Sequence, residues 1–131
     1  MRSIDSPRDR SAPSHFAGMS LSGEPLECDL DALTLVLAVK EECMGCRNVI
    51  EAPANSFGEV AVLIVASAMP SEPWWSTSPH RVVISAPLLM ALDVRWPPFY
   101  VLVDPVVGRV VTEGVIFGSE QVREEIARYL V

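Results

Sequence analysis

Four apolar stretches of strand length divide the chain. Leu33 to Val39 and Val60 to Ala66 are almost continuously apolar, as expected for strands that are buried on both faces. About 20 residues separate these two stretches, which leaves room for a crossover helix, so we expect the strands to be parallel. Phe99 to Val103 and Arg109 to Val115 are joined by a short loop that contains a proline and a glycine. This loop predicts an antiparallel hairpin.

Helical patterns lie between and after these strands. Cys43 to Phe57 carries apolar residues on one face at helical spacing, and Pro53 within it is expected to kink the helix. Ser85 is predicted to cap a second helix, which extends to Leu92. Ser119 is predicted to cap a third helix, whose inward face is formed by Val122, Ile126, Tyr129 and Leu130.

The element order predicts an α/β domain over residues 23–131. A β-α-β unit is followed by a helix, two strands and a helix, which predicts a central mixed β-sheet flanked by helices. Residues 24–31 are acidic, with an alternation from Leu26 to Leu30 that indicates a short edge strand. Residues 1–22 are rich in Ser, Pro, Arg and Asp and show neither helical nor strand periodicity, so we expect a flexible N-terminal arm.

Composition narrows the function classes. The chain has 131 residues, with 17 acidic and 10 basic side chains, and its net charge of −7 argues against a nucleic-acid partner. Eleven prolines argue against a helical bundle. Neither a membrane-spanning stretch nor a secretory signal is recognisable, and three cysteines cannot all pair within one chain. We therefore expect a cytoplasmic protein, or an extracytoplasmic one if an anchor is missing from this chain.

Two cysteines stand where the first buried strand gives way to the first helix, in the motif Cys43-Met44-Gly45-Cys46. At a helix N-terminus the free N–H groups and the helix dipole favour a thiolate, here that of Cys43. Cys46 lies one turn further on, where it can attack a mixed disulfide formed at Cys43. The spacing therefore predicts a two-step dithiol–disulfide exchange that needs no organic cofactor.

The motif and the element order resemble the thioredoxin-like family over roughly residues 24–130, nearest its redoxin/TlpA-like branch. Val94 to Asp104 resembles the segment in which that family places a cis-proline opposite the CxxC pair. By spacing, Pro98 matches this proline, with Pro97 as the alternative. The resemblance implies a thiol-disulfide oxidoreductase with Cys43 as nucleophile, Cys46 as resolving thiol and Pro98 shaping the substrate groove. It also implies substrate contacts from Trp96, Pro97, Met44 and Gly45.

The sequence departs from this family near the motif. Glu42 precedes the first cysteine, where a tryptophan is common, and Leu37 takes the place of a buried acid. The proton acceptor is therefore open, and Glu41 or Glu42 could serve if its side chain turned inward. The negative charge of these two residues opposes a thiolate at Cys43, whereas Lys40 and Arg47 favour one.

Two other interpretations use the same residues. A zinc site would need further ligands from Cys28, His15 or His80, and these lie scattered along the chain, so we expect no metal. Alternatively, the CxxC is vestigial and the Trp74-Trp75 loop docks a protein. The predicted partners of the redox protein are a disulfide-bearing protein or a small thiol, together with an electron-donor reductase. We expect Cys28 to be a passive thiol and His80 to be a solvated surface residue.

Overall fold

The sheet is built around strand β3 (Thr34–Val39), all six residues of which are buried. The computed structural model describes residues 11–41 and 43–130. β3 pairs in parallel with β4 (Ala61–Ala66) and antiparallel with β6 (Phe99–Asp104). The predicted parallel pair is therefore confirmed, and the chain crosses from one of its strands to the other through helix α1 (Met44–Glu51).

Seven strands form one mixed sheet in the order β2-β1-β5-β4-β3-β6-β7. The predicted hairpin is β6 with β7 (Arg109–Val115), which pair antiparallel across a turn that Gly108 completes with a φ of 73°. The short edge strand predicted in the acidic segment is β2 (Pro25–Asp29). Strand β5 (Arg81–Ile84) lies parallel to β4 and has no counterpart in the sequence prediction.

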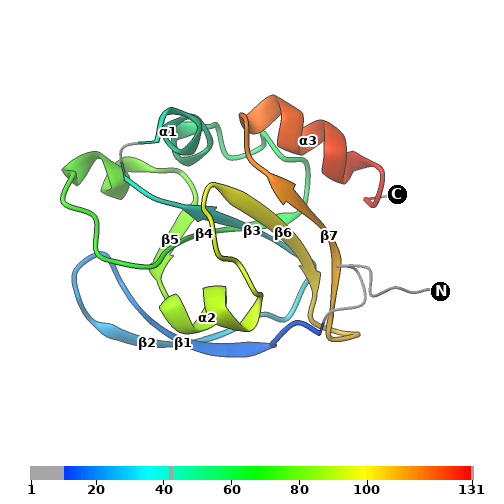
Figure 1. The fold of residues 1–131 in the computed structure, drawn as a ribbon, viewed down its shortest axis with the longest axis horizontal. Helices are drawn as coiled ribbons and strands as arrows, with labels where there is room; N and C mark the ends of the chain where they lie inside the picture. Colours follow the sequence, from blue (N-terminus) through cyan, green and yellow to red (C-terminus); the bar gives the residue numbers. More distant parts are fainter. Residues whose placement is uncertain (1–10, 42, 131) are drawn as a thin grey trace.

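Helices cover both faces of the sheet. Figure 1 shows α1 and α3 (Ser119–Ala127) on one face and α2 (Ala86–Ala91) on the other. Alternate side chains of β3 pack in two different hydrophobic cores, one on each face of the sheet, because successive residues of a strand point to opposite faces. Leu35 and Leu37 pack in the core that includes Cys46 and Trp75, whereas Val36 and Ala38 pack in the core that includes Leu88 of α2.

The predicted N-terminal arm is wrong for residues 11–22. His15–Met19 forms strand β1, which pairs antiparallel with β2 along its whole length and places Met19 opposite Ile84 of β5. A methyl group added to Gly18 would stand 2.9 Å from the Ile84 carbonyl oxygen, so glycine permits this close approach. Phe16 is the only buried residue of this strand, so the sequence of the strand lacks the alternation of apolar and polar residues that would have predicted it. Residues 1–10 of the predicted arm lie outside the described residues.

Two predicted helix ends are also wrong. α1 ends at Glu51 instead of continuing with a kink to Phe57, because Ala52 precedes Pro53 and is extended. The capping residue of α3 is Gly118 rather than Ser119. The Ser119 N–H instead donates to Oδ1 of Asn48 in α1, over 2.7 Å. The predicted cap of α2 is confirmed, since Ser85 Oγ accepts from the Leu88 N–H.

His80 is buried, whereas the sequence predicted a solvated residue. It is 8% exposed, and its ring centroid lies 5.7 Å from that of Phe57. Within the described part of the chain, its Nε2 has no hydrogen-bond partner. Burial lowers the pKa of His80 below its ordinary value of 6.5, and a hydrogen bond to the Ala52 backbone acts in the opposite direction. The folded protein therefore favours the neutral imidazole.

We expect the free energy of unfolding to fall as the pH is lowered below about 6.5, because the unfolded chain then binds a proton that folded His80 resists. Above that pH the imidazole is neutral in both states, and its contribution is constant. One proton gives a slope of at most about 1.4 kcal/mol per pH unit. Urea unfolding at about pH 7.5 and about pH 5.5 should show a larger loss for the wild type than for His80→Gln.

His15 titrates in the opposite sense and is present in both proteins, so its contribution cancels in this comparison. Its pKa is raised by hydrogen bonds to Asp29 and Glu27, which accept from the two ring nitrogens over 2.7 Å and 2.6 Å. An equal loss of stability in the wild type and the variant would show that His80 does not cause the effect.

Candidate functional site

Cys43 occupies the capping position of α1. Its backbone is extended, with φ −130° and ψ 115°, and its Sγ accepts a hydrogen bond from the Cys46 N–H over 3.1 Å. Because of this hydrogen bond, the Cys43 sulfur takes the place that a serine or aspartate oxygen usually holds at a helix start. The start of the helix therefore offers a backbone N–H group to the Cys43 sulfur. The Cys43 side chain is half-buried.

Cys46 lies on the buried face of the same helix. It is fully buried in the core beneath α1, and its Sγ accepts a hydrogen bond from the Lys40 N–H over 3.5 Å. Burial, together with the neighbouring Cys43, raises the pKa of the Cys46 thiol to about 12, while Lys40 acts in the opposite direction. At neutral pH Cys46 is therefore a protonated thiol, and both cysteines are free in this structure.

The segment that precedes β6 lies beside the residues that follow β7. The Pro97–Pro98 peptide bond is cis, as the sequence analysis predicted for Pro98. The Pro98 carbonyl oxygen accepts from the Ile116 N–H over 3.2 Å. A methyl group added to Gly45 would stand 3.7 Å from the Ile116 carbonyl oxygen. Residues near Ile116 thus connect the proline segment to the CxxC helix.

The Trp96 side chain is 79% exposed. It lines a cavity of about 490 Å³ together with Phe99 and Val115. Phe117, at 78% exposed, is a second large apolar side chain at the surface and directly follows Ile116. The side chain of Met44 lies outside what the structure describes.

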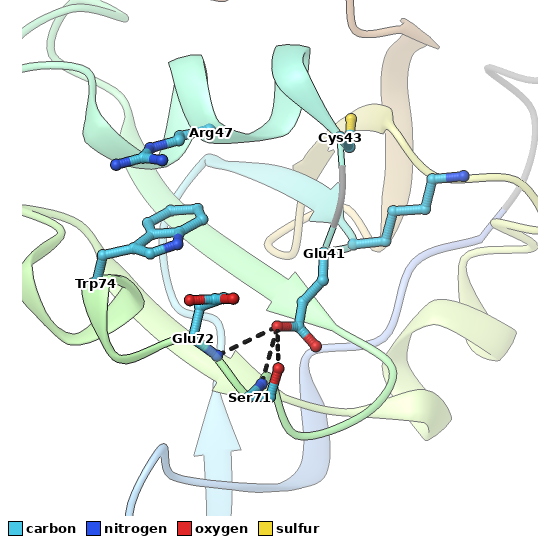
Figure 2. A pocket seen from close by; sticks show the side chains of 7 residues that line it. Glu41, Cys43, Arg47, Ser71, Glu72 and Trp74 are labelled. Atoms are coloured by element: carbon cyan, nitrogen blue, oxygen red, sulfur yellow. Dashed lines mark hydrogen bonds between the residues drawn. The ribbon is translucent and has the colours of Figure 1, made fainter.

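A second cavity of about 630 Å³ opens beside Cys43. Figure 2 shows Arg47 and Trp74 facing one another across one side of it, and Glu41, Ser71 and Glu72 gathered on another. The arginine Cζ lies 4.6 Å from the centroid of the Trp74 ring. The residues that line this cavity are Lys40, Glu41, Cys43, Arg47, Ser71, Glu72 and Trp74.

Glu41 does not turn toward the cysteines. Its Oε2 accepts three hydrogen bonds: from the Ser71 N–H over 2.9 Å, the Ser71 hydroxyl over 2.8 Å and the Glu72 N–H over 3.2 Å. The bonds from Ser71 hold the pKa of Glu41 below its ordinary value. Figure 2 shows the Cys43 sulfur pointing away from this carboxylate. Glu41 is therefore placed to anchor the segment after β4, and Glu42 lies outside the described residues.

The Trp74-Trp75 pair divides between surface and core. Trp75 is 1% exposed and belongs to the core that contains Cys46, whereas Trp74 is half-buried and faces Arg47. Both tryptophans belong to the 3-10 helix η2 (Pro73–Thr77). The contact of Glu41 with Ser71 is not predictable from the sequence, because the two residues are 30 positions apart and no local pattern indicates it.

The remaining sequence candidates lie apart from this site. Cys28 is buried in the second core and accepts a hydrogen bond from Arg81 Nη2 over 3.3 Å. Leu37, which takes the place of the family's buried acid, is fully buried opposite Tyr100. Over residues 11–41 and 43–130, no three His, Cys, Asp or Glu side chains are grouped so as to hold a metal ion.

Comparison with known proteins identifies the fold. No protein-family model matches the chain, and no curated protein matches its sequence. A conserved protein of unknown function from Bacteroides fragilis is 21% identical, with a TM-score of 0.65 over 96% of this chain and 100% of that one. A protein assigned as the thiol:disulfide interchange protein DsbE from Chlorobium tepidum is 18% identical, with a TM-score of 0.67 over 98% and 100%.

The thioredoxin domain of a thiol-disulfide oxidoreductase from Bacteroides vulgatus is also 18% identical, with a TM-score of 0.66 over 98% of this chain and 100% of that domain. The predicted thioredoxin-like fold is therefore confirmed. Among the described helices, none has the length and apolar character that crossing a membrane requires.

Proposed function

We propose that this protein is a thiol-disulfide oxidoreductase that exchanges its Cys43–Cys46 dithiol for a partner's disulfide. The Cys43 thiolate attacks one sulfur of the partner, and the other sulfur leaves as a thiolate that takes up a proton. Cys46 then loses its proton and attacks the Cys43 Sγ, which releases the second partner thiol. Two electrons pass from the cysteines to the partner, and no cofactor carries them.

The contrast between the two thiols supports this proposal. Cys43 is half-buried and accepts a hydrogen bond from the helix, whereas Cys46 is fully buried with a pKa raised to about 12. An attacking thiol must reach a partner as a thiolate, and a resolving thiol must stay protected until the mixed disulfide forms. The two environments match these two tasks.

The neighbouring residues have proposed roles in substrate contact. Pro98 shapes the groove beside the cysteines, and Trp96 supplies an exposed aromatic surface along it. Pro97, Met44 and Gly45 complete the proposed contacts. The expected partners are a disulfide-bearing protein or a small thiol, and in the cytoplasm a reductase would return the pair to the dithiol form.

A redox titration in glutathione buffers, quenched with a thiol-alkylating mass tag, tests this proposal. Cys28→Ser serves as the background, so that only two thiols are counted. We expect two tags to be lost together at a single midpoint, because one disulfide forms from both cysteines. Retention of both tags across the whole range, or their independent loss, would exclude the oxidoreductase and leave a thioredoxin-fold module that binds a partner through its Trp74-Trp75 loop.

A further inference from the structure

The loop that follows β7 lies between the CxxC helix and the segment that contains the cis-proline. On one side, its Ile116 N–H donates to the Pro98 carbonyl oxygen over 3.2 Å. On the other side, a methyl group added to Gly45 would stand 3.6 Å from the Phe117 carbonyl oxygen and 3.7 Å from that of Ile116, which is ordinary van der Waals contact. The position of this loop therefore sets the spacing between the CxxC helix and the proline segment.

Gln121 of α3 holds this loop on both sides of Ile116. Its Oε1 accepts hydrogen bonds from the Phe117 N–H over 2.8 Å and from the Gly118 N–H over 3.4 Å, and its Nε2 donates to the Val115 carbonyl oxygen over 2.9 Å. A glutamine that only capped α3 would need the Gly118 bond alone. The other two bonds join the residues directly before and after Ile116, so Gln121 fixes the residue that contacts the proline segment.

Asn48 joins the same loop to the CxxC helix. It lies two positions after Cys46 on α1, and its Oδ1 accepts a hydrogen bond from the Ser119 N–H over 2.7 Å. The capping residue of α3 is Gly118, which has no side chain that could accept an N–H at the start of the helix. A methyl group added to Gly118 would stand 3.4 Å from the same Oδ1. The helix that carries Cys46 thus supplies the oxygen that binds the start of α3.

We propose that Gln121 and Asn48 are positioning residues for the disulfide exchange, which together hold the Pro98 segment at a fixed spacing from the CxxC helix. Gln121 acts by fixing Ile116 against Pro98, and Asn48 acts by fixing the start of α3 against α1. This inference rests on the proposed function, in which Pro98 shapes the groove beside the cysteines.

A fixed spacing matters more to a polypeptide substrate than to a small one. A polypeptide must place its main chain along the groove while its sulfur meets Cys43, whereas a small disulfide presents little more than its sulfur atoms. A misplacement of about 1 Å can slow a positioned reaction about a hundredfold. The effect here should be smaller, because Ile116 stays buried in the core when either side chain is removed. Loss of Gln121 or Asn48 should therefore slow exchange with polypeptide disulfides selectively.

Two neutral disulfides with the same reactive cysteine test this inference. One is the disulfide-linked dimer of a short capped peptide whose central cysteine is flanked by alanine and serine, and the other is the disulfide of N-acetylcysteine amide, which lacks the flanking residues. Each accepts two electrons from Cys43 and Cys46, and its two halves leave as thiols. The second-order rate constant for oxidation of the reduced protein is measured with each in the Cys28→Ser background. The ratio of the peptide to the small-disulfide rate constant cancels any change in the intrinsic reactivity of Cys43.

We expect the wild type to react faster with the peptide, and Gln121→Ala and Asn48→Ala to lower the ratio about threefold to tenfold. Gln121→Glu keeps an oxygen that accepts from the loop N–H groups but cannot donate to Val115, so its ratio should lie between those of the wild type and Gln121→Ala. Asn48→Asp keeps the oxygen that accepts from the Ser119 N–H and should retain the wild-type ratio.

Ser85→Ala is the matched control. It removes the capping oxygen of α2, which lies on the opposite face of the sheet from α1 and α3 (Figure 1). It should lower the free energy of unfolding, measured with urea, and leave the ratio unchanged. A residue that only stabilised the fold would behave in the same way.

If Gln121→Ala and Asn48→Ala lower the ratio no more than Ser85→Ala, while both disulfides oxidise the protein, the inference fails and the oxidoreductase stands. Equal slowing of the two disulfides would also overturn it, and so would a wild-type ratio near one, because the peptide would then gain nothing from the groove. If neither compound forms a Cys43–Cys46 disulfide, the proposed function itself fails.

Discussion

Cys46→Ser is expected to accumulate a mixed disulfide on Cys43, and Cys43→Ser is expected to form none. Without the resolving thiol the first step still occurs, but the second has no nucleophile. Disulfide turnover should fall by at least about a thousandfold in Cys43→Ser, since the whole covalent route is lost. Intact-protein mass spectrometry after mixing with bis(2-hydroxyethyl) disulfide measures the adduct, and a coupled reductant assay measures turnover.

Cys28→Ser is the matched control for both variants, because Cys28 is buried in the other core and bonded to Arg81. It should turn over disulfides at the wild-type rate. An adduct on Cys46→Ser that disappears when Cys28 is also replaced would assign the reactive thiol to Cys28 and refute the proposed roles. Circular dichroism establishes that each variant is folded before its activity is compared.

Trp75→Ala is expected to lower the free energy of unfolding by about 3–5 kcal/mol, the usual range for removing a fully buried aromatic side chain. Trp75 is 1% exposed and packs in the core that contains Cys46, Ile50 and Leu37. Its Nε1 has no hydrogen-bond partner among the residues that the structure describes, so the loss comes from packing alone. Urea unfolding with a comparison of m-values measures the change.

Trp74→Ala is the matched control one position earlier. Trp74 is half-buried and contacts Arg47, so we expect a loss of no more than about 1 kcal/mol. Trp75→Phe keeps part of the packing, so its loss in free energy of unfolding should lie between the losses of Trp75→Ala and Trp74→Ala. This variant takes the place of Trp75→Ala in the test if Trp75→Ala does not fold. Equal losses at both positions would show that the core does not depend on Trp75 as described.

Long apolar runs made the centre of the fold predictable. β3 and β4 are buried on both faces, so their side chains need no alternation and their sequences are apolar throughout. β1 and β5 were missed because they are short and rely on pairing with neighbours: β1 has one buried residue, Phe16, and β5 has only four residues. Backbone hydrogen bonds to neighbouring strands hold such strands in the sheet. Because these bonds do not depend on the side chains, they produce no recognisable pattern of apolar and polar residues.

The sequence by itself determined the parallel pairing of β3 with β4, the hairpin of β6 with β7, the CxxC at a helix start and the proline that precedes β6, because each depends on residues close together in the chain. Only the tertiary structure decided that Cys46 is buried while Cys43 is half-buried, that Glu41 binds Ser71, and that Lys40 and Glu72 stand in one cavity. Burial and charge pairing depend on which distant segments pack together. That choice reflects the energy of the whole fold rather than the pattern of any one segment.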